Sequence, residues 1–245
     1  MSEDQSAIPS QGWGVLHLYY GIRGDRNDPV DVAEAEALIA AFEARDDYQA
    51  LPFSVIGQRA DFGLMLVGPD LVELQRLHRA LEGTPLGARL EPRPELSFVS
   101  ITEASEYLAD DGSERVQAMR AARMHPRDLP MRRLICFYPM SKRRGSEHNW
   151  YTLEFDERSR LMHGHGHTGR AFAGRITQLI TAATGLSDWE WGVTLFADDP
   201  KAVKDVVYEM RYDEGSAIYG EFGPFTLGLL APLRRAVSDA GLAVG

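Results

Sequence analysis

The sequence lacks several features that would assign it to a common functional class. It has one cysteine, Cys136, so no disulfide can form within the chain and a reducing compartment is expected. No apolar run approaches the roughly 20 residues that a membrane-spanning helix needs. The first residues, MSEDQSAIPSQ, lack the basic and apolar regions of a signal peptide. We therefore expect a cytoplasmic protein without a membrane span.

Positive charge is also scarce, with 26 Lys and Arg against 36 Asp and Glu and a net charge of −10. This balance argues against nucleic acid as a partner, because binding to phosphates needs clustered cations. The exception is MRRLICFYPMSKRRG (131–145), which holds five basic residues and no acid. A basic segment in an acidic protein suggests an anionic ligand, although a solvated loop explains the same residues.

Three of the seven histidines lie at alternate positions in RLMHGHGHTGR (160–170), namely His163, His165 and His167. On a strand, alternate residues share a face, and three histidines could bind one zinc or copper ion. On a helix, alternate residues point about 200° apart and could not. The zinc motifs CxxC and HExxH do not occur in the chain.

The flanks of this cluster predict a helix or a junction between two helices. DERSRLM precedes it, and AFAGRITQLITAATG follows with Gly185 as a candidate C-cap. The apolar residues of the second flank stand at helical spacing: Phe172, Ile176, Leu179 and Ile180. A site that uses all three histidines is therefore not expected. The residues alone leave open a single axial haem ligand and histidines without any metal role.

A repeat links the two halves of the sequence. FGLMLVGPDLVELQRLHRAL (62–81) aligns with WGVTLFADDPKAVKDVVYEM (191–210), 129 residues further on. In both segments an apolar strand leads to an aspartate, Asp70 or Asp199, which is followed by apolar residues at helical spacing. The repeat indicates an old duplication.

The flanks of the repeat complete the same plan in both halves. Opening strands are predicted at 14–22 and 134–140, closing strands at 96–101 and 222–230, and a helix at 31–44 with a counterpart between 156 and 184. Each half is then β-α-β-β-α-β, a ferredoxin-like unit. We expect the α+β class, with tandem ferredoxin-like repeats forming a dimeric α+β barrel within one chain.

Several longer motifs occur in order over most of 123–230. They are CFYPMSKRR with NWY, HGHTGR, WGVTLFADDP and VYEMRYDEGSAIYGEFGPF. In these motifs the chain resembles the chlorite dismutase-like family of haem proteins, and especially its coproheme decarboxylase branch. The resemblance implies a tandem ferredoxin-like α+β barrel, usually a homopentamer. Residues 1–11 are polar and are expected to be disordered. The resemblance divides the rest of the chain into a half without cofactor (12–122) and a half with the haem site (123–245).

The resemblance also implies roles for individual residues. Only His165 fits the HGxxGR pattern of the iron ligand, and Tyr138 of YPMSK matches the catalytic tyrosine. Gln178 stands where chlorite dismutases carry a distal arginine, and His125 is a candidate distal base that takes a proton from peroxide. The residues expected to hold the propionates or line the cofactor are Arg123, Tyr138, Met140, Ser141, Lys142, Gln178 and Ser216.

The implied reaction is a peroxide-dependent decarboxylation in haem biosynthesis. Two propionates of iron-coproporphyrin III (coproheme) become vinyl groups, giving haem b. A Tyr138 radical would take hydrogen from the propionate, so coproheme is both substrate and redox centre. A chlorite dismutase-type enzyme and a haem-binding or delivery protein are the alternatives. Hydrogen peroxide and transient contact with coproporphyrin ferrochelatase complete the expected partners.

Overall fold

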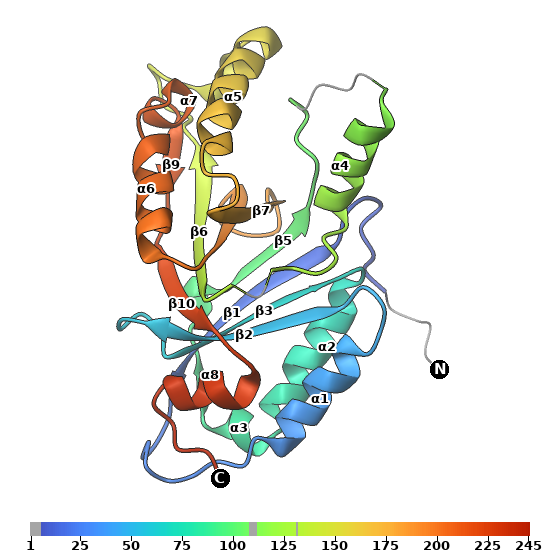
Figure 1. Ribbon diagram of the computed structural model, residues 1–245, viewed down its shortest axis with the longest axis vertical. Coiled ribbons are helices and arrows are strands. Elements are labelled where there is room, and N and C mark those ends of the chain that lie inside the picture. The colour runs from blue at the N-terminus through green and yellow to red at the C-terminus, as the bar shows by residue number, and fades with distance from the viewer. Residues whose placement is uncertain (1–5, 108–111, 131) are drawn as a thin grey trace.

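The computed structural model describes residues 6–107, 112–130 and 132–245. The first half follows the predicted β-α-β-β-α-β order (Figure 1). Its elements are β1 (Gly14–Ile22), α1 (Ala33–Glu43), β2 (Gln49–Ile56), β3 (Phe62–Gly68), α2 (Leu71–Glu82), α3 (Pro85–Ala88), β4 (Leu90–Pro92) and β5 (Phe98–Thr102). A connecting helix, α4 (Glu114–Met124), leads to the second half.

The second half repeats this order and adds a terminal helix. Its elements are β6 (Leu134–Lys142), α5 (Phe155–Arg170), β7 (Ile176–Ala182), β8 (Trp191–Ala197), α6 (Pro200–Met210), α7 (Glu214–Ala217), β9 (Gly220–Phe222), β10 (Thr226–Leu230) and α8 (Leu233–Asp239). The two halves are therefore tandem ferredoxin-like repeats, as the sequence predicts.

The two four-stranded sheets join at both edges. Within the halves the strand orders are β2-β3-β1-β5 and β7-β8-β6-β10, and β10 pairs antiparallel with β2. At the other edge, β5 pairs with β7 through Ile101 and Thr102. Eight strands thus close into a ring, with β4 and β9 attached to β1 and β6. Closure leaves no unpaired edge among these eight strands.

The strands are apolar on both faces because both faces are covered. Val15 and Tyr19 of β1 lie inside the ring, where they pack in one cluster with Phe137 and Phe196 of the second half. Leu16 and Leu18, the alternate residues of β1, belong to a second cluster beneath α1, α2 and α8. Figure 1 shows these helices below the ring and α4 to α7 above it.

Both amphipathic helices of the repeat begin at their aspartates. The Asp70 side chain accepts from the Val72 N–H at the start of α2, and Asp199 accepts from the Lys201 N–H at the start of α6. These N-caps satisfy amide groups that would otherwise lack partners. The duplicated Asp position therefore has the same structural role in both halves.

The predicted helix after the histidine cluster is wrong. Helix α5 ends at Arg170, Gly174 adopts a φ of 82°, and Ile176–Ala182 form strand β7. Gly185, the candidate C-cap, instead lies in the connection between β7 and β8 with a φ of 80°. The run ITQLIT is rich in β-branched residues, and sheet pairing on both sides decides its conformation.

Segments at both chain ends contact the first half. The predicted disordered N-terminus (1–11) lies partly outside the described residues, but the Ala7 N–H donates to Asp70 Oδ1 at 2.8 Å. Helix α8 packs in the cluster of the first half, although it follows the second half in sequence. None of the helices in the described part of the chain has the length and apolar character of a membrane span.

Candidate functional site

Helix α5 separates the three alternate histidines. His165 is half-buried, whereas His163 and His167 are exposed. The Nδ1 atom of His163 lies 2.8 Å from the Ser159 carbonyl oxygen, one turn earlier in the helix. The cluster therefore presents one histidine to the interior, as helical geometry predicts.

A buried carboxylate orients His165. Its Nδ1 lies 2.9 Å from Oδ2 of Asp213, whose side chain is 7% exposed. Because an ionised carboxylate only accepts hydrogen bonds, Nδ1 carries the proton. In the neutral imidazole the lone pair is then on Nε2, which is the atom available to a metal.

The acceptor Asp213 is itself held by several donors. Burial alone would raise its pKa, but hydrogen bonds from His165 and Ser216 and from the Gly215 N–H outweigh burial and lower the pKa. Asp213 also caps helix α7 by accepting from the Gly215 N–H at 3.0 Å. The carboxylate therefore stays ionised behind His165, with its position fixed by the helix start.

Two predicted propionate ligands lie in this buried cluster. Ser216 is 5% exposed, and its Oγ lies 3.3 Å from Nδ1 of His165. Lys142 is 7% exposed; its Nζ donates to the Gly215 carbonyl at 3.0 Å and lies 4.2 Å from the Trp150 ring centroid. In this structure Ser216 contacts His165 directly, and Lys142 binds the backbone beside Ser216. Their contact with a propionate stays a prediction.

The ammonium group of Lys142 stands between two acids. Burial lowers its pKa to about 8, while the charges of Asp213 and Glu190 oppose that shift. Glu190, 7% exposed, accepts from the Lys142 backbone N–H at 2.7 Å, and its own N–H donates to Ser141 Oγ at 3.2 Å. Ser141 is thus engaged in joining β6 to the start of β8.

Tyr138 and Met140 share the face of β6 that carries Lys142, because alternate residues of a strand point the same way. From Tyr138 to Lys142 the strand rises by about 13 Å. The Tyr138 ring stacks on Phe225 with centroids 4.3 Å apart, and burial raises the pKa of its phenol. A neutral phenol therefore lies on the sheet face that α5 and α6 cover.

Gln178 lies on the same sheet face as Tyr138. It pairs with Leu195 of β8, which pairs with Cys136 of β6, two residues before Tyr138. Gln178 and its neighbour Ile180 are exposed, whereas Leu179 faces the interior of the ring. Strand spacing places the Cα atoms of Gln178 and Tyr138 roughly 12 Å apart, and the exposed Ile180 lies across Val193 of β8 from Tyr138.

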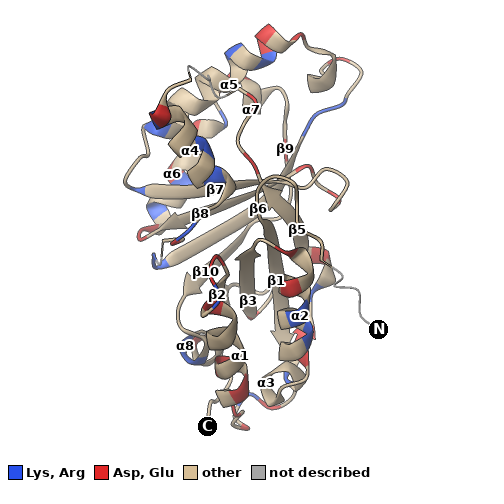
Figure 2. Cartoon of the chain, turned by 90° about the vertical axis from the view of Figure 1, so that its right-hand side faces the viewer, with Lys and Arg blue, Asp and Glu red and all other residues tan. Residues whose placement is uncertain are grey.

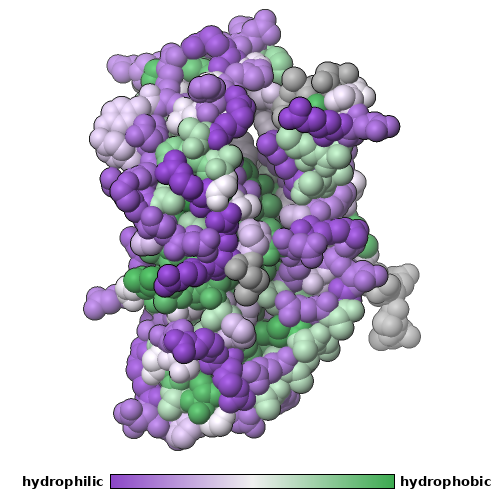
Figure 3. Space-filling model, in the orientation of Figure 1, coloured by the Kyte–Doolittle hydropathy of each residue, from purple (hydrophilic) through white to green (hydrophobic). Residues whose placement is uncertain are grey.

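Arg123 and His125 lie at the end of α4. Arg123 is exposed, and His125 caps the helix with its ring 5.4 Å from that of Trp13. Figure 3 shows the surface hollowed between α5 and α4, and Figure 2 shows Lys and Arg positions, coloured blue on the ribbon, near these helices. The described contacts do not bring His125 to His165 or Tyr138, so its role as distal base stays a prediction.

The profile of the chlorite dismutase family matches residues 30–231. The chain belongs to the chlorite dismutase family. It is 40% identical over 240 residues to a coproheme decarboxylase of Staphylococcus carnosus, covering 93% of this chain and 95% of that protein.

Two solved structures share the fold of this chain. A protein of Thermus thermophilus described as a novel heme-binding protein is 33% identical, with a TM-score of 0.81 over 97% of this chain and 99% of that one. Chlorite dismutase from Candidatus Nitrospira defluvii has a TM-score of 0.77 over 95% of this chain and 97% of that one. At 17% identity, the second likeness concerns the fold alone.

Sequence reasoning missed two acids of the site, Asp213 and Glu190. A signal for Asp213 exists in the repeat: its counterpart in the first half is Thr84, which caps α3 as Asp213 caps α7. The capping residue is charged in the half that carries His165 and neutral in the other half. This difference indicates that Asp213 has a role in addition to capping α7. Glu190 has no comparable signal, because only the folded chain brings it to Lys142.

Proposed function

We propose that this protein is a coproheme decarboxylase, which uses hydrogen peroxide to convert two propionates of iron-coproporphyrin III into vinyl groups and so forms haem b. The relative in Staphylococcus carnosus carries this name. The observation that carries the proposal is the pair formed by His165 and Asp213, 2.9 Å apart, on the same side of the sheet as Tyr138.

The residues present fit an iron porphyrin. His165 would hold the iron through Nε2, and Asp213 would raise the basicity of that imidazole through Nδ1. A flat apolar macrocycle suits the exposed apolar surface at Ile180. When bound, the iron would supply a redox centre through which peroxide, the oxidant, is reduced to water while each propionate loses two electrons and CO2.

The chain's own residues would then perform three tasks. His165 and Asp213 would hold and orient the substrate. Tyr138 would give up an electron and a proton and then take a hydrogen atom from the propionate β-carbon. The carbon radical that remains would form the vinyl group by losing CO2 and one further electron, for which peroxide is the final acceptor. The basic residues of 131–145 and Arg123 bind propionates through charge-assisted hydrogen bonds. The part of the site that receives the propionates is proposed to be lined by Met140, Ser141, Lys142 and Ser216. His125 is proposed to take the proton from peroxide.

The test is to mix the protein with iron-coproporphyrin III and peroxide and to follow product mass. Loss of two CO2 units supports the proposal, and an unchanged mass refutes it. The Tyr138→Phe variant should bind coproheme with the same spectrum and release no CO2. Tyr208→Phe is the matched control, because Tyr208 is a half-exposed phenol in the same half of the chain that is bonded to Tyr212 on the surface.

Two other functions give different results in the same preparation. A chlorite dismutase would release oxygen from chlorite, and the neutral Gln178 argues against this because a distal arginine is missing. A haem-delivery protein would bind haem b more tightly than coproheme and form no product with peroxide. The buried, stacked phenol of Tyr138 favours catalysis, because binding alone requires no redox-active group.

We further propose that the protein acts in the cytoplasm as a homopentamer, with transient contact to the ferrochelatase that supplies coproheme. The division into residues 1–11, 12–122 and 123–245, with the haem site in the last segment, is part of this proposal. Mass determination in solution tests the pentamer. A monomer that retains full turnover would refute the need for assembly.

A further inference from the structure

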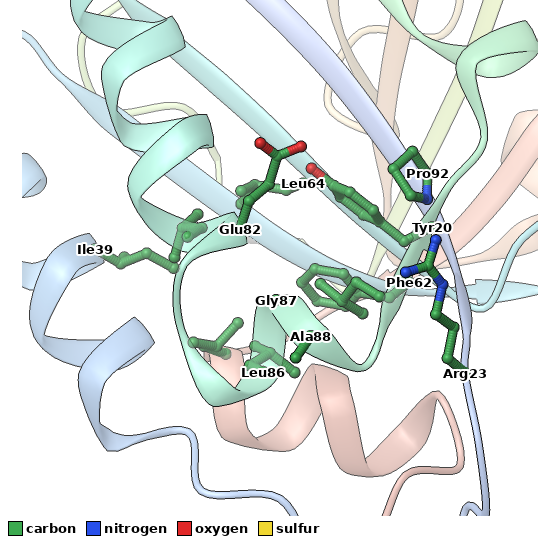
Figure 4. A pocket seen from close by; sticks show the side chains of 13 residues that line it. Tyr20, Arg23, Ile39, Phe62, Leu64, Glu82, Leu86, Gly87, Ala88 and Pro92 are labelled. Atoms are coloured by element: carbon green, nitrogen blue, oxygen red, sulfur yellow. The ribbon is translucent and has the colours of Figure 1, made fainter.

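The first half contains a cavity of about 270 Å³ between its sheet and its helices. Figure 4 shows it between β1 and β3 on one side and α1, α2 and α3 on the other. Its apolar wall is made of side chains that are at most 7% exposed: Ile39, Phe62, Leu64, Leu86 and Leu233. The volume is at the lower end of those of small-molecule sites.

In the second half, the corresponding position is occupied by the polar cluster around His165, which also contains Asp213, Ser216 and Lys142. Tyr20 pairs with Pro92 on β4 as Met140 pairs with Phe222 on β9, so Tyr20 corresponds to Met140. By the same register Ile22 corresponds to Lys142, and the repeat offset aligns Thr84 with Asp213 and Gly87 with Ser216. The first half therefore has a cavity between sheet and helices where the second half has the polar side chains around His165.

The replacements determine what the cavity can bind. Ile22, Thr84 and Gly87 supply neither the buried cation nor the carboxylate that surround His165, and the described residues of the cavity wall include no histidine or cysteine. These lining residues therefore provide no metal ligand set. The apolar wall instead suits an aliphatic or aromatic group of fewer than about a dozen non-hydrogen atoms.

Two charged side chains, Glu82 and Arg23, lie at different ends of the cavity rim, so the two ends differ in charge. Glu82 is already paired, with Arg79 at 2.6 Å and His78 at 3.3 Å. Arg23 is exposed, and no carboxylate lies within 4.0 Å of its guanidinium in the described part of the chain. In Figure 4 the Tyr20 hydroxyl points toward Glu82, whereas the guanidinium of Arg23 lies beside Pro92 at the other end. An anionic head group would thus be attracted to Arg23 and kept away from Glu82.

We propose that this cavity binds a small monocarboxylic acid, with its apolar tail in the cavity and its carboxylate on the Arg23 guanidinium. The site is separate from that of coproheme and does not depend on the proposed decarboxylation. Tyr20 is 5% exposed, and its hydroxyl points toward Glu82, at the end of the cavity away from Arg23 (Figure 4).

The experiment is a calorimetric titration of the full-length protein with octanoate. We expect one site with a Kd on the order of 0.1–1 mM, the range for a ligand of about ten non-hydrogen atoms. Heptylamine, which has the same seven-carbon tail and the opposite charge, should bind at least about tenfold more weakly. Equal binding of the two, or no saturable octanoate binding, would overturn the proposal.

Two variants locate the site without disturbing the core. Arg23→Gln should weaken octanoate about tenfold, and Arg59→Gln, the same change at an exposed arginine outside the cavity, should leave the affinity unchanged. Ala88→Phe, at an exposed position of the cavity rim, should abolish binding. Coproheme titration and thermal unfolding of each variant verify the fold. Unchanged octanoate affinity in folded Arg23→Gln and Ala88→Phe would refute the assignment.

Discussion

Replacing Asp213 by Asn tests how the buried carboxylate controls His165. Asn keeps the size of the side chain and an oxygen that can cap the Gly215 N–H, now 3.0 Å from Asp213 Oδ1. It removes the charge that fixes the proton on Nδ1 of His165, and its amide can donate to Nδ1 and favour the other tautomer. That tautomer has its proton on Nε2, the atom needed by the iron.

The expected effect is a 10- to 100-fold weaker affinity for coproheme, the usual cost of losing the partner of a metal-binding histidine. This corresponds to about 1.4–2.7 kcal/mol. Apoprotein stability should fall by about 1–3 kcal/mol, because Asp213 accepts several hydrogen bonds while largely buried. Coproheme titration followed by absorbance, and urea unfolding of the apoprotein, measure the two quantities.

The pH dependence supplies an independent check. The folded-state pKa of Asp213 is lowered, so its contribution to stability is complete above the unfolded pKa of about 3.9 and is lost as pH falls through the folded value. Asp213→Asn should therefore flatten the acid limb of stability below about pH 5. Glu214→Gln is the control, because this exposed neighbour loses the same charge. If Asp213→Asn binds coproheme as tightly as Glu214→Gln, the reasoning about His165 is wrong.

Three further predictions concern other residues. Tyr138→Phe should change the free energy of unfolding by less than about 1 kcal/mol, since the Tyr138 hydroxyl has no partner among the described residues. The same variant should lose decarboxylation, measured by product mass, and retained turnover would exclude the phenol from the mechanism. Gln178→Arg, at an exposed site, should alter the free energy of unfolding by at most ~0.5 kcal/mol and add oxygen release from chlorite, measured with an oxygen electrode. If no oxygen is released, Gln178 is not the residue that prevents chlorite chemistry. Burial lowers the pKa of His17 from 6.5 to about 3, so stability is complete above pH 6.5 and falls as pH drops toward 3, by about 2 kcal/mol at pH 5. Urea unfolding of His17→Gln at pH 7.5 and pH 5 should lack this contribution, and an identical pH dependence in both proteins would contradict it.

Local pattern was sufficient for most of the repeat. The predicted strand 14–22 coincides with β1, and the Asp-initiated helices begin where Asp70 and Asp199 stand. These elements are predictable because caps and apolar spacing act within a few residues. The helical assignment of His165 also came from its neighbours, and it sufficed to exclude a shared face for the three histidines.

Contacts distant in sequence were not predictable in the same way. The sequence predicts helix at β7 because Phe172, Ile176 and Leu179 stand at helical spacing, and only pairing with β5 and β8 makes this segment a strand. The contact of His165 with Asp213 joins residues 48 positions apart. A motif can point to a histidine, but the group that sets its tautomer is found only when helices α5 and α7 meet.

The position of β10 has a consequence for synthesis of the chain. This strand supplies partners to both β2 and β6, yet Thr226–Leu230 follows every other strand of the ring in sequence. While the chain emerges from the ribosome, the edges of β2 and β6 stay unpaired until these five residues have been added, and such edges invite association between nascent chains. Emergence of β10 is thus the moment at which the ring becomes safe from aggregation through those edges.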